Sequence, residues 1–254
     1  MISVIIPAYN AGAYIKAALL SVFRQNVEIG FEILVCDDGS VDDTHQVVDE
    51  MSQKHPAIKL FRHAENLGTS AARNLLLEKL DVNSNYVIFL DADDILANGA
   101  IEKSLAVLRA NPLARFVTGM YQVVPTKALE TGEPVSPEWP TVGGAMLSAG
   151  MFKTDLIREV GCFDTSFDHG EDADFRLRIA EITNAFVFHD YIFFYYRRHA
   201  NNVTRDFMAS QSGIRRAMLL HAMRRRKNPA LLGAAGMVRA EDMAEIERAL
   251  KLYE

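Results

Sequence analysis

The sequence is poor in cysteine and has no long apolar run, and each absence excludes a class of protein. Cys36 and Cys162 are the only cysteines among 254 residues, too few for a disulfide framework or a four-thiolate metal site. A reducing, cytoplasmic setting is therefore expected. No apolar run approaches the roughly 20 residues that span a bilayer, and residues 1–9 lack the basic start and long apolar stretch of a signal peptide.

Positive charge is also scarce. The chain has 27 Lys and Arg residues against 33 Asp and Glu residues, which gives a formal net charge of -6. Proteins dedicated to nucleic acids are usually basic, so we expect no nucleic-acid partner. The hydrophobic fraction of 49% and the charged fraction of 24% are close to the globular average and argue against disorder.

Short β-branched runs alternate with segments that carry apolar residues at helical spacing over about the first hundred residues. We expect strands at 2–6, 31–35, 58–61 and 86–90, and helices at 14–25, 42–51, 70–80 and 100–108. The alternation predicts an α/β fold with a mainly parallel sheet covered by helices on both faces. Ligands of such sheets bind beyond the carboxyl ends of the strands.

The later part of the chain has a different texture. Residues 125–140 hold four of the eight prolines and the only tryptophan, which predicts a long surface loop. Further strands are expected at 144–152, 185–189 and 192–196, with a helix at 171–182 and a mostly helical tail from residue 207.

Acidic residues follow the second and fourth expected strands, at 37–38 and 91–94. Asp91 and Asp93 are two residues apart, so on an extended backbone they point the same way. Adjacent carboxylates repel each other, and a divalent cation with oxygen ligands, Mg²⁺ or Mn²⁺, would resolve the conflict. The alternative is a solvated acidic turn in which Asp94 caps the helix near Ala100 and Ser40 or Asp42 caps the helix starting near Asp43.

The order and spacing of seven short motifs resemble those of family 2 glycosyltransferases. They are SVIIPAYN at 3–10, DDGS at 37–40, NLG at 66–68 with ARN at 72–74, DADD at 91–94, GCFD at 161–164, EDADF at 171–175 and RRH at 197–199. The resemblance implies an inverting, nucleotide-sugar-dependent enzyme with the GT-A fold, a Rossmann-like mixed, mainly parallel sheet flanked by helices. It implies a catalytic domain at 1–205, with a nucleotide-binding half at 1–95, an acceptor-side half at 96–205 and a helical C-terminal extension at 206–254.

The resemblance also implies roles toward the donor. Asp38 would accept a hydrogen bond from the nucleotide base, usually the uracil N3–H, while Pro7 and Tyr9 line the same pocket. Arg73 would lie near the diphosphate, which suits the fork of a guanidinium group. Core packing of Tyr9, and an ion pair of Arg73 with Asp38 or Asp91, are the alternatives.

The same resemblance places a divalent metal, Mn²⁺ or Mg²⁺, on the diphosphate, where it stabilises charge on the departing nucleotide. Asp93 would bind the metal directly, and Asp91 would contact the ribose or reach the metal through water. His199 matches a histidine that in some relatives contacts the metal or the diphosphate. A purely structural histidine is the alternative.

Asp172 is the candidate general base, with Glu171 beside it in the family's Glu-Asp motif. A helix start favours the carboxylate anion, whereas the neighbouring Glu171 acts to raise the pKa of Asp172. In the implied reaction Asp172 accepts the proton of an acceptor hydroxyl, whose oxygen attacks the anomeric carbon opposite the nucleotide and inverts its configuration. The alternative is that both residues only cap the helix.

We therefore expect a glycosyltransferase of the hexosyl or N-acetylhexosaminyl class that acts in polysaccharide biosynthesis. Its donor would be a nucleotide-diphosphate sugar, UDP-linked in the family's common case, and its acceptor a hydroxyl of a glycan or lipid-linked acceptor. A sugar-nucleotide pyrophosphorylase is disfavoured because residues 7–12 are not glycine-rich, and a dehydrogenase because no Gly-x-Gly-x-x-Gly opens the first helix. A non-catalytic nucleotide-sugar binding module is disfavoured because Asp93 and Asp172 are both present.

The tail is locally basic, with arginine or lysine at 215–216 and 224–227 and with Leu219, Leu220 and Met223 at helical spacing. Two interpretations stay open. A basic amphipathic helix can rest on an anionic membrane surface, here the inner face of the cell membrane, which would suit a lipid-linked acceptor. Alternatively, the helix docks on the catalytic domain and keeps its charges in water.

Overall fold

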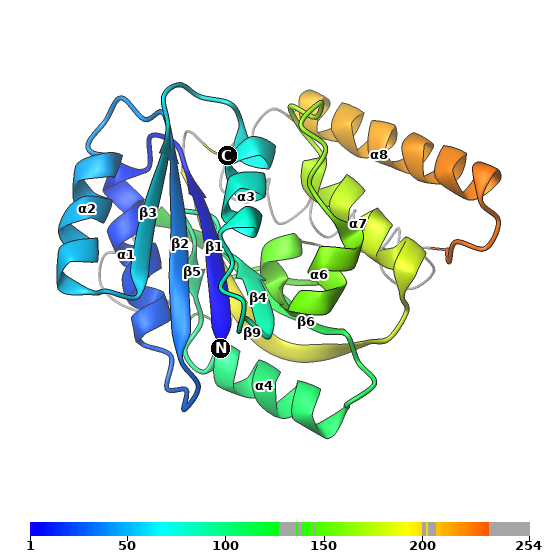
Figure 1. Cartoon of the computed structure of the whole chain (residues 1–254), viewed down its shortest axis with the longest axis horizontal. Helices are drawn as coiled ribbons and strands as arrows, with labels where there is room; N and C mark the ends of the chain where they lie inside the picture. The colour runs from blue at the N-terminus through cyan, green and yellow to red at the C-terminus, as the bar shows by residue number, and fades with distance from the viewer. Residues whose placement is uncertain (127–135, 137–138, 145, 200–201, 203–206, 234–254) are drawn as a thin grey trace.

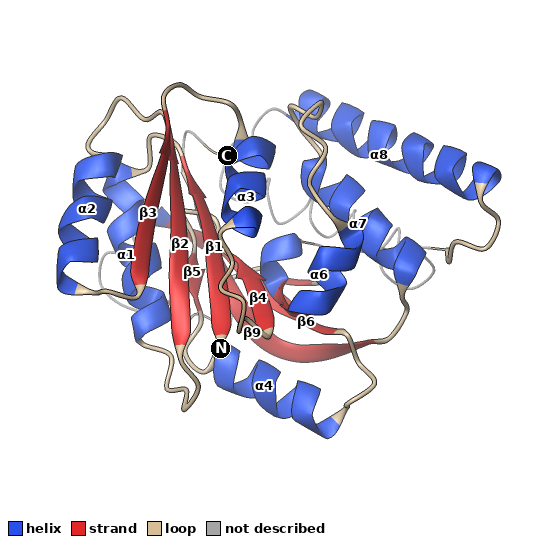
Figure 2. Cartoon of the chain, viewed as in Figure 1, coloured by secondary structure: helices blue, strands red, loops and turns tan. Residues whose placement is uncertain are grey.

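The fold is a single nine-stranded sheet with helices on both faces (Figures 1 and 2). The computed structural model describes residues 1–126, 136, 139–144, 146–199, 202 and 207–233. The strands are β1 (Ile2–Ala8), β2 (Phe31–Asp38), β3 (Ile58–His63), β4 (Tyr86–Phe89), β5 (Ile95–Leu96), β6 (Phe116–Pro125), β7 (Thr141–Gly143), β8 (Gly150–Lys153) and β9 (Phe186–Arg198). The helices are α1 (Gly12–Phe23), α2 (Thr44–Lys54), α3 (Thr69–Glu78), α4 (Ala100–Ala110), α6 (Thr154–Val160), α7 (Glu171–Ile182) and α8 (Phe207–Lys227), with a 3₁₀ turn, η1 (Leu147–Ala149).

The sheet is parallel on one side and mixed on the other. Its order is β3-β2-β1-β4-β8-β6-β9-β5, and β7 pairs with β6. Strands β1 to β4 form the parallel part, which confirms the four strands predicted at the start of the chain. Beyond β4 the direction reverses, because β8 runs antiparallel to both β4 and β6.

Two hydrophobic cores lie on opposite faces of the sheet. Side chains alternate along β1, so Val4 and Ile6 join the core beneath α1, α2 and α4, while Ile5 joins the core beneath α3, α6 and α7. All seven residues of β1 are buried, as expected for a parallel strand with both faces covered. Figure 1 shows α1 and α2 on one side, α3, α6 and α7 on the other, and α8 alongside α7.

Three parts of the later chain differ from the sequence-based expectation. The expected strand at 144–152 is instead a 3₁₀ turn followed by the short strand β8. Leu147, Ser148 and Ala149 are all fully buried, and periodicity cannot tell a strand from a turn in such a run. The strands expected at 185–189 and 192–196 are one strand, β9, with an irregular register opposite residues 118–121 of β6, which accommodates the polar pair His189 and Asp190.

Strand β6 and helix α6 have no counterpart in the sequence-based expectation. β6 lies between β8 and β9, and its partners are distant in the sequence. Gly119 lies where a Cβ atom would come within 2.9 Å of the Tyr191 carbonyl oxygen, so the bulge between β6 and β9 needs a glycine there. Most of the long loop predicted at 125–140, namely 127–135 and 137–138, lies outside the described residues.

The helical tail is confirmed as far as Lys227, and residues 234–254 lie outside the described part. Within the described ranges, no helix combines the length and apolar character that crossing a membrane requires.

Candidate active site

The carboxyl edge of the parallel strands brings together side chains from four elements. Asp91 and Asp93 follow β4, Arg73 comes from α3, Glu171 and Asp172 occupy the first turn of α7, and His199 follows β9. Their hydrogen bonds and ion pairs divide them into a cluster around Arg73 and a cluster around Asp93. Asp91 and Asp93 join the two.

Arg73 connects the end of β4 to the start of α7. Its side chain is only 2% exposed. Nη2 donates to Asp91 at 2.9 Å, while Nη1 donates to Asp172 and lies 3.4 Å from Glu171. The ion pair with Asp91 that was considered as an alternative is therefore present, together with two more. One guanidinium group thus neutralises part of the charge of three neighbouring carboxylates.

Burial and the charge of Arg73 shift the pKa values of Asp91 and Asp172 in opposite senses. Burial is the largest effect on Asp172 and raises its pKa; Arg73 opposes the shift and Glu171 adds to it. Burial also raises the pKa of Asp91, again against Arg73 and with the help of Asp172 and Asp93. For Arg73 burial acts to lower the pKa, but the three carboxylates outweigh it, so the pKa is raised and the group stays charged.

The second cluster lies around Asp93. Its Oδ2 atom is 2.8 Å from His199 Nε2 and accepts a hydrogen bond of 3.3 Å from Asn202 Nδ2. The His199 ring stacks on Tyr14 with ring centroids 4.6 Å apart. Arg197 Nε donates to the Asp93 carbonyl oxygen at 2.6 Å, which fixes the backbone that carries the carboxylate.

Asp93 and His199 offer two ligand atoms of kinds that divalent cations bind. Asp93 Oδ2 and His199 Nε2 are 2.8 Å apart, close to the spacing of neighbouring ligands on an octahedral ion with bonds of about 2.1 Å. The side chain of Asp93 is 27% exposed and that of His199 is 9% exposed. Within the described ranges, no three His, Cys, Asp or Glu residues form a cluster that could hold a metal ion.

The Asp38 carboxylate forms hydrogen bonds with neighbouring residues of the chain. It is buried, its Oδ1 lies 2.6 Å from His63 Nδ1 and accepts from the Leu67 amide at 3.1 Å, and its Oδ2 accepts from the Gly68 amide at 2.8 Å. These bonds hold the turn that precedes α3 and Arg73. The role of Asp38 toward a nucleotide base stays a prediction.

Tyr9 lies in the open at the end of β1. Its side chain is 48% exposed, which rules out the core-packing alternative, while Pro7 is buried within β1. The following loop is held to the loop after β2 and to the start of α2, because the Val41 amide donates to Asn10 Oδ1 at 3.0 Å and the Ala11 amide donates to Thr44 Oγ1 at 2.7 Å. The backbone that follows the exposed Tyr9 ring is therefore held in place.

The capping alternatives are largely wrong. Helix α7 is preceded by Gly170 without a side-chain cap, and both Glu171 and Asp172 face Arg73 instead. Asp94 does not cap α4, which follows Gly99; its Oδ1 accepts from the Arg197 amide at 2.9 Å. Burial, with Asp93 and Asp91 nearby, raises the pKa of Asp94 well above its usual value. Asp42 accepts from the Thr44 amide at 3.0 Å at the start of α2, although the residue before the helix is Asp43, and Ser40 Oγ instead accepts from the Asn10 amide at 3.0 Å.

Three contacts in the site were not anticipated. Ser148 Oγ donates to Asp91 Oδ2 at 3.3 Å, Asn202 contacts Asp93, and Tyr14 supports His199. The position of Asn202, three residues after His199, is a sequence signal for its place in the site. Its Oδ1 accepts a hydrogen bond from the His199 amide at 2.6 Å. No sequence signal indicates Ser148, because its position in the site depends on the 3₁₀ turn η1.

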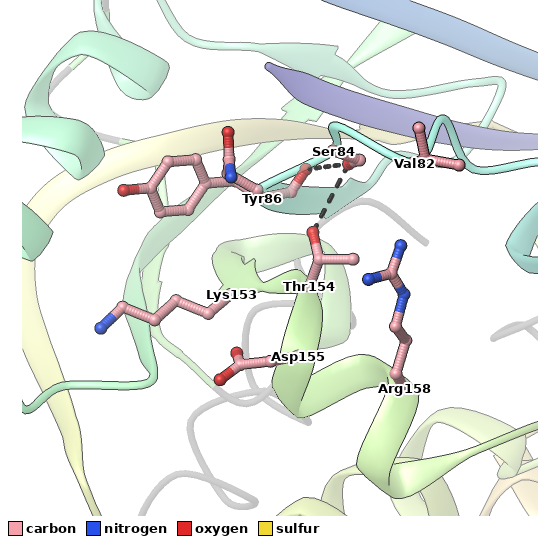
Figure 3. A pocket seen from close by; sticks show the side chains of 8 residues that line it. Val82, Ser84, Tyr86, Lys153, Thr154, Asp155 and Arg158 are labelled. Atoms are coloured by element: carbon pink, nitrogen blue, oxygen red, sulfur yellow. Dashed lines mark hydrogen bonds between the residues drawn. The ribbon is translucent and has the colours of Figure 1, made fainter.

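A groove of about 380 Å³ lies elsewhere, near the start of β4 (Figure 3). Lys153, Thr154 and Arg158 line it together with Tyr86. Asp91 follows the opposite end of β4, so this groove is not part of the candidate active site.

Residues 3–135 match the family model described as Glycosyl transferase family 2. The chain is 29% identical over 187 residues to the UDP-Glc:alpha-D-GlcNAc-diphosphoundecaprenol beta-1,3-glucosyltransferase WfgD of Escherichia coli, covering 72% of this chain and 71% of that one. It is 38% identical over 113 residues to an uncharacterized glycosyltransferase of Haemophilus influenzae, covering 44% of each. The minor teichoic acid biosynthesis protein GgaA of Bacillus subtilis is 37% identical over 106 residues, 40% of this chain and 23% of that protein. The match thus spans less than half of the latter two relatives.

Two solved structures share the fold of this chain. TarS of S. aureus, residues 1–349 in complex with UDP-GlcNAc, matches with a TM-score of 0.70 and 20% identity over 98% of this chain and 71% of that one. The mannosyltransferase PcManGT of Pyrobaculum calidifontis, in complex with GDP-Man and Mn2+, matches with a TM-score of 0.60 and 19% identity, covering 100% and 81%. The predicted GT-A fold is confirmed, and the chain belongs to glycosyl transferase family 2.

Proposed function

We propose that the protein is a metal-dependent, inverting glycosyltransferase that moves a sugar from a nucleotide-diphosphate sugar to a hydroxyl group of a glycan or lipid-linked acceptor. The observation that carries the proposal is the Arg73 cluster, in which one buried cation joins the acidic end of β4 to the candidate base on α7. The residues proposed to bind the donor and the residue proposed to activate the acceptor would then lie at one edge of the sheet.

A UDP-linked donor and a lipid-linked acceptor are supported by the relatives. WfgD is named for a UDP-glucose donor and a diphosphoundecaprenol acceptor, and the TarS structure holds UDP-GlcNAc. In this chain the exposed ring of Tyr9 would receive the base, together with Pro7 and Asp38, because an aromatic face covers a planar ring. Arg73 would lie toward the diphosphate, where its charge also attracts phosphate oxygens.

Asp93 and His199 would hold the divalent metal, Mn²⁺ or Mg²⁺, and Asp91 would lie beside it. The PcManGT structure contains Mn2+, and the 2.8 Å separation of the two side chains suits a shared ion. When bound, the metal would neutralise charge on the diphosphate of the departing nucleotide.

Asp172 would act as the general base. A base works best when its pKa lies close to the working pH, and burial with the neighbouring Glu171 moves the pKa of Asp172 upward in that direction. Arg73 holds the carboxylate in one orientation. Asp172 would take the proton of the acceptor hydroxyl while that oxygen displaces the nucleotide, and a single displacement inverts the anomeric centre.

The Asp172→Asn variant tests this assignment. General-base removal should lower kcat about 10²–10⁴-fold, whereas UDP affinity, measured by calorimetry, should stay within twofold. Asp168→Asn, a change at an exposed carboxylate in the loop before α7, serves as the control and should keep wild-type turnover. Near-normal turnover of Asp172→Asn, or loss of UDP binding along with activity, would contradict the role.

We further propose that the outer face of α8 contacts an anionic membrane surface. The helix has six arginine and lysine residues and no acidic one, in a chain of net charge -6. Met218, Leu219 and Met223 are 47–61% exposed on it, beside the exposed Arg215 and Arg226. Such a face buries its apolar side chains among lipids while the cations meet anionic headgroups.

Co-sedimentation with vesicles tests the membrane contact. Binding to phosphatidylglycerol-containing vesicles at low salt, absent with pure phosphatidylcholine and weakened in Leu219→Glu, is expected. An unchanged supernatant with anionic vesicles at low salt would eliminate the contact.

A further inference from the structure

Helix α8 contacts the turn that leads into the candidate base. A Cβ atom added to Gly170 would lie 2.5 Å from the carbonyl carbon of Gly213 on α8, and one added to Gly213 would overlap the His169 carbonyl oxygen. The two backbones therefore touch without side chains between them. Gly170 has φ +84° and directly precedes Glu171, so the contact at His169 and Gly170 is two to three residues from the base Asp172.

Arg216 fastens α8 to the same loop. Its Nη1 donates to the Ser166 carbonyl oxygen at 2.6 Å and its Nη2 to Ser166 Oγ at 2.7 Å. The guanidinium carbon lies 4.3 Å from the centre of the Phe167 ring. Ala217 is fully buried in a small core with Phe167 and Leu177. The loop thus has polar and apolar contacts to one stretch of α8.

Further along, α8 is bound to α7 through charges. Arg224 donates to Asp174 at 2.9 Å and to Glu181 at 2.8 Å, and His221 Nδ1 lies 2.7 Å from Glu181. The two carboxylate side chains are only 3% and 6% exposed. Buried carboxylates are strongly destabilising when they lose a partner, so these bonds oppose separation of the helices.

The other end of the loop is fixed from α3. Asn74 exchanges two hydrogen bonds with the backbone of Phe163, of 2.9 and 2.7 Å. The Phe163 ring lies 5.3 Å below the Arg73 guanidinium and stacks on Phe175 of α7 at 4.0 Å. With this end held, displacement at the Gly213 end would act on the first turn of α7.

We infer that α8 is a positioning element of the reaction and that Gly213 sets the place of the catalytic base. The inference rests on the proposed role of Asp172. A base is effective only when held to within about 0.5 Å of its productive position, and a misplacement of about 1 Å can cost on the order of 10²-fold in rate. The catalytic unit therefore includes α8 and does not end before it.

Gly213→Ala tests the inference, because a single methyl group must push α8 away from the turn. We expect kcat to fall about 10–100-fold, with UDP affinity within twofold of wild type. Backbone amides of residues 166–174 should exchange hydrogen faster. Ser212→Ala, at the exposed neighbouring position of the same helix, should change neither quantity.

Arg216→Ala is the second variant, since it adds no atoms and removes the bonds to Ser166 and the contact with the Phe167 ring. It should lower kcat and speed exchange in the same segment, to a smaller extent. Wild-type kcat in Gly213→Ala, or a lower kcat without faster exchange at 166–174, would overturn the inference. Failure of the proposed function would show differently, as normal turnover by Asp172→Asn.

Discussion

Arg73 is the residue on which the charges of the site depend. Three carboxylates face its guanidinium group, and two of them, Asp91 and Asp172, have raised pKa values chiefly because they are buried. Their mutual repulsion would grow if the cation were removed. Burying these carboxylates together therefore lowers the free energy of unfolding, and the charge of Arg73 offsets part of that loss.

The Arg73→Met variant should lose stability in a pH-dependent way. Without the cation, the pKa values of Asp91 and Asp172 rise further in the folded state. A carboxyl group with a raised folded-state pKa takes up its proton more readily when folded, so stability falls as pH rises from about 4 through that pKa. We expect a loss of about 3 kcal/mol at pH 7.5 and a smaller loss at pH 5.

Urea unfolding of wild type and Arg73→Met at the two pH values measures this difference. Arg115→Met is the matched control, because Arg115 pairs with the exposed carboxylates of Asp155 and Glu159, and such surface pairs contribute about 1 kcal/mol or less. An equal loss at both pH values would show that Arg73 acts through packing and not through charge.

At the scale of elements, Arg224 contributes two of the ion pairs that hold α8 to α7. This residue bridges two buried carboxylates, whereas Arg226 on the same helix is exposed. Arg224→Ala should therefore destabilise the protein by about 3 kcal/mol, which for a chain of this size is roughly 6–12 °C in Tm. Arg226→Ala should leave Tm unchanged. Calorimetric scans of both variants at neutral pH would show it, and similar Tm values for the two would refute the bridging role.

The sequence predicts elements well where the pattern is local and poorly where it is not. Strands β1 to β4 are short β-branched runs bounded by turns, and each was predicted within a few residues. Helix α7 was predicted with both ends correct. In contrast, β6 depends on partners about 20 to 75 residues away, and the 3₁₀ turn at residues 147–149 is buried on all sides, so neither leaves a periodic signal.

At the scale of the whole molecule, the strand order decides which residues meet. The rule that ligands bind at the carboxyl ends of parallel strands predicts that the ends of β1, β2 and β4 lie together. It does not predict that Arg73 reaches Asp172, 99 residues away in the sequence, or that Ser148 contacts Asp91. Those contacts depend on where β8, β9 and α7 lie relative to the parallel strands, which sequence spacing does not specify.

The nucleotide and metal dependence of thermal unfolding tests the central claim most directly. The wild-type protein would be unfolded with UDP, GDP, TDP or CDP, each with and without Mn²⁺. Saturation at about 100 times Kd adds about 2.7 kcal/mol, or roughly 5–10 °C in Tm. Asp93→Ala is the test variant, and Asp190→Ala, at a side chain 95% exposed, is the control.

One nucleotide, which we expect to be UDP, should raise Tm only with Mn²⁺, and the shift should disappear in Asp93→Ala but persist in Asp190→Ala. No shift with any nucleotide, or a shift that is independent of Mn²⁺ and retained in Asp93→Ala, would contradict a metal-dependent nucleotide-sugar site at the carboxyl edge of the sheet.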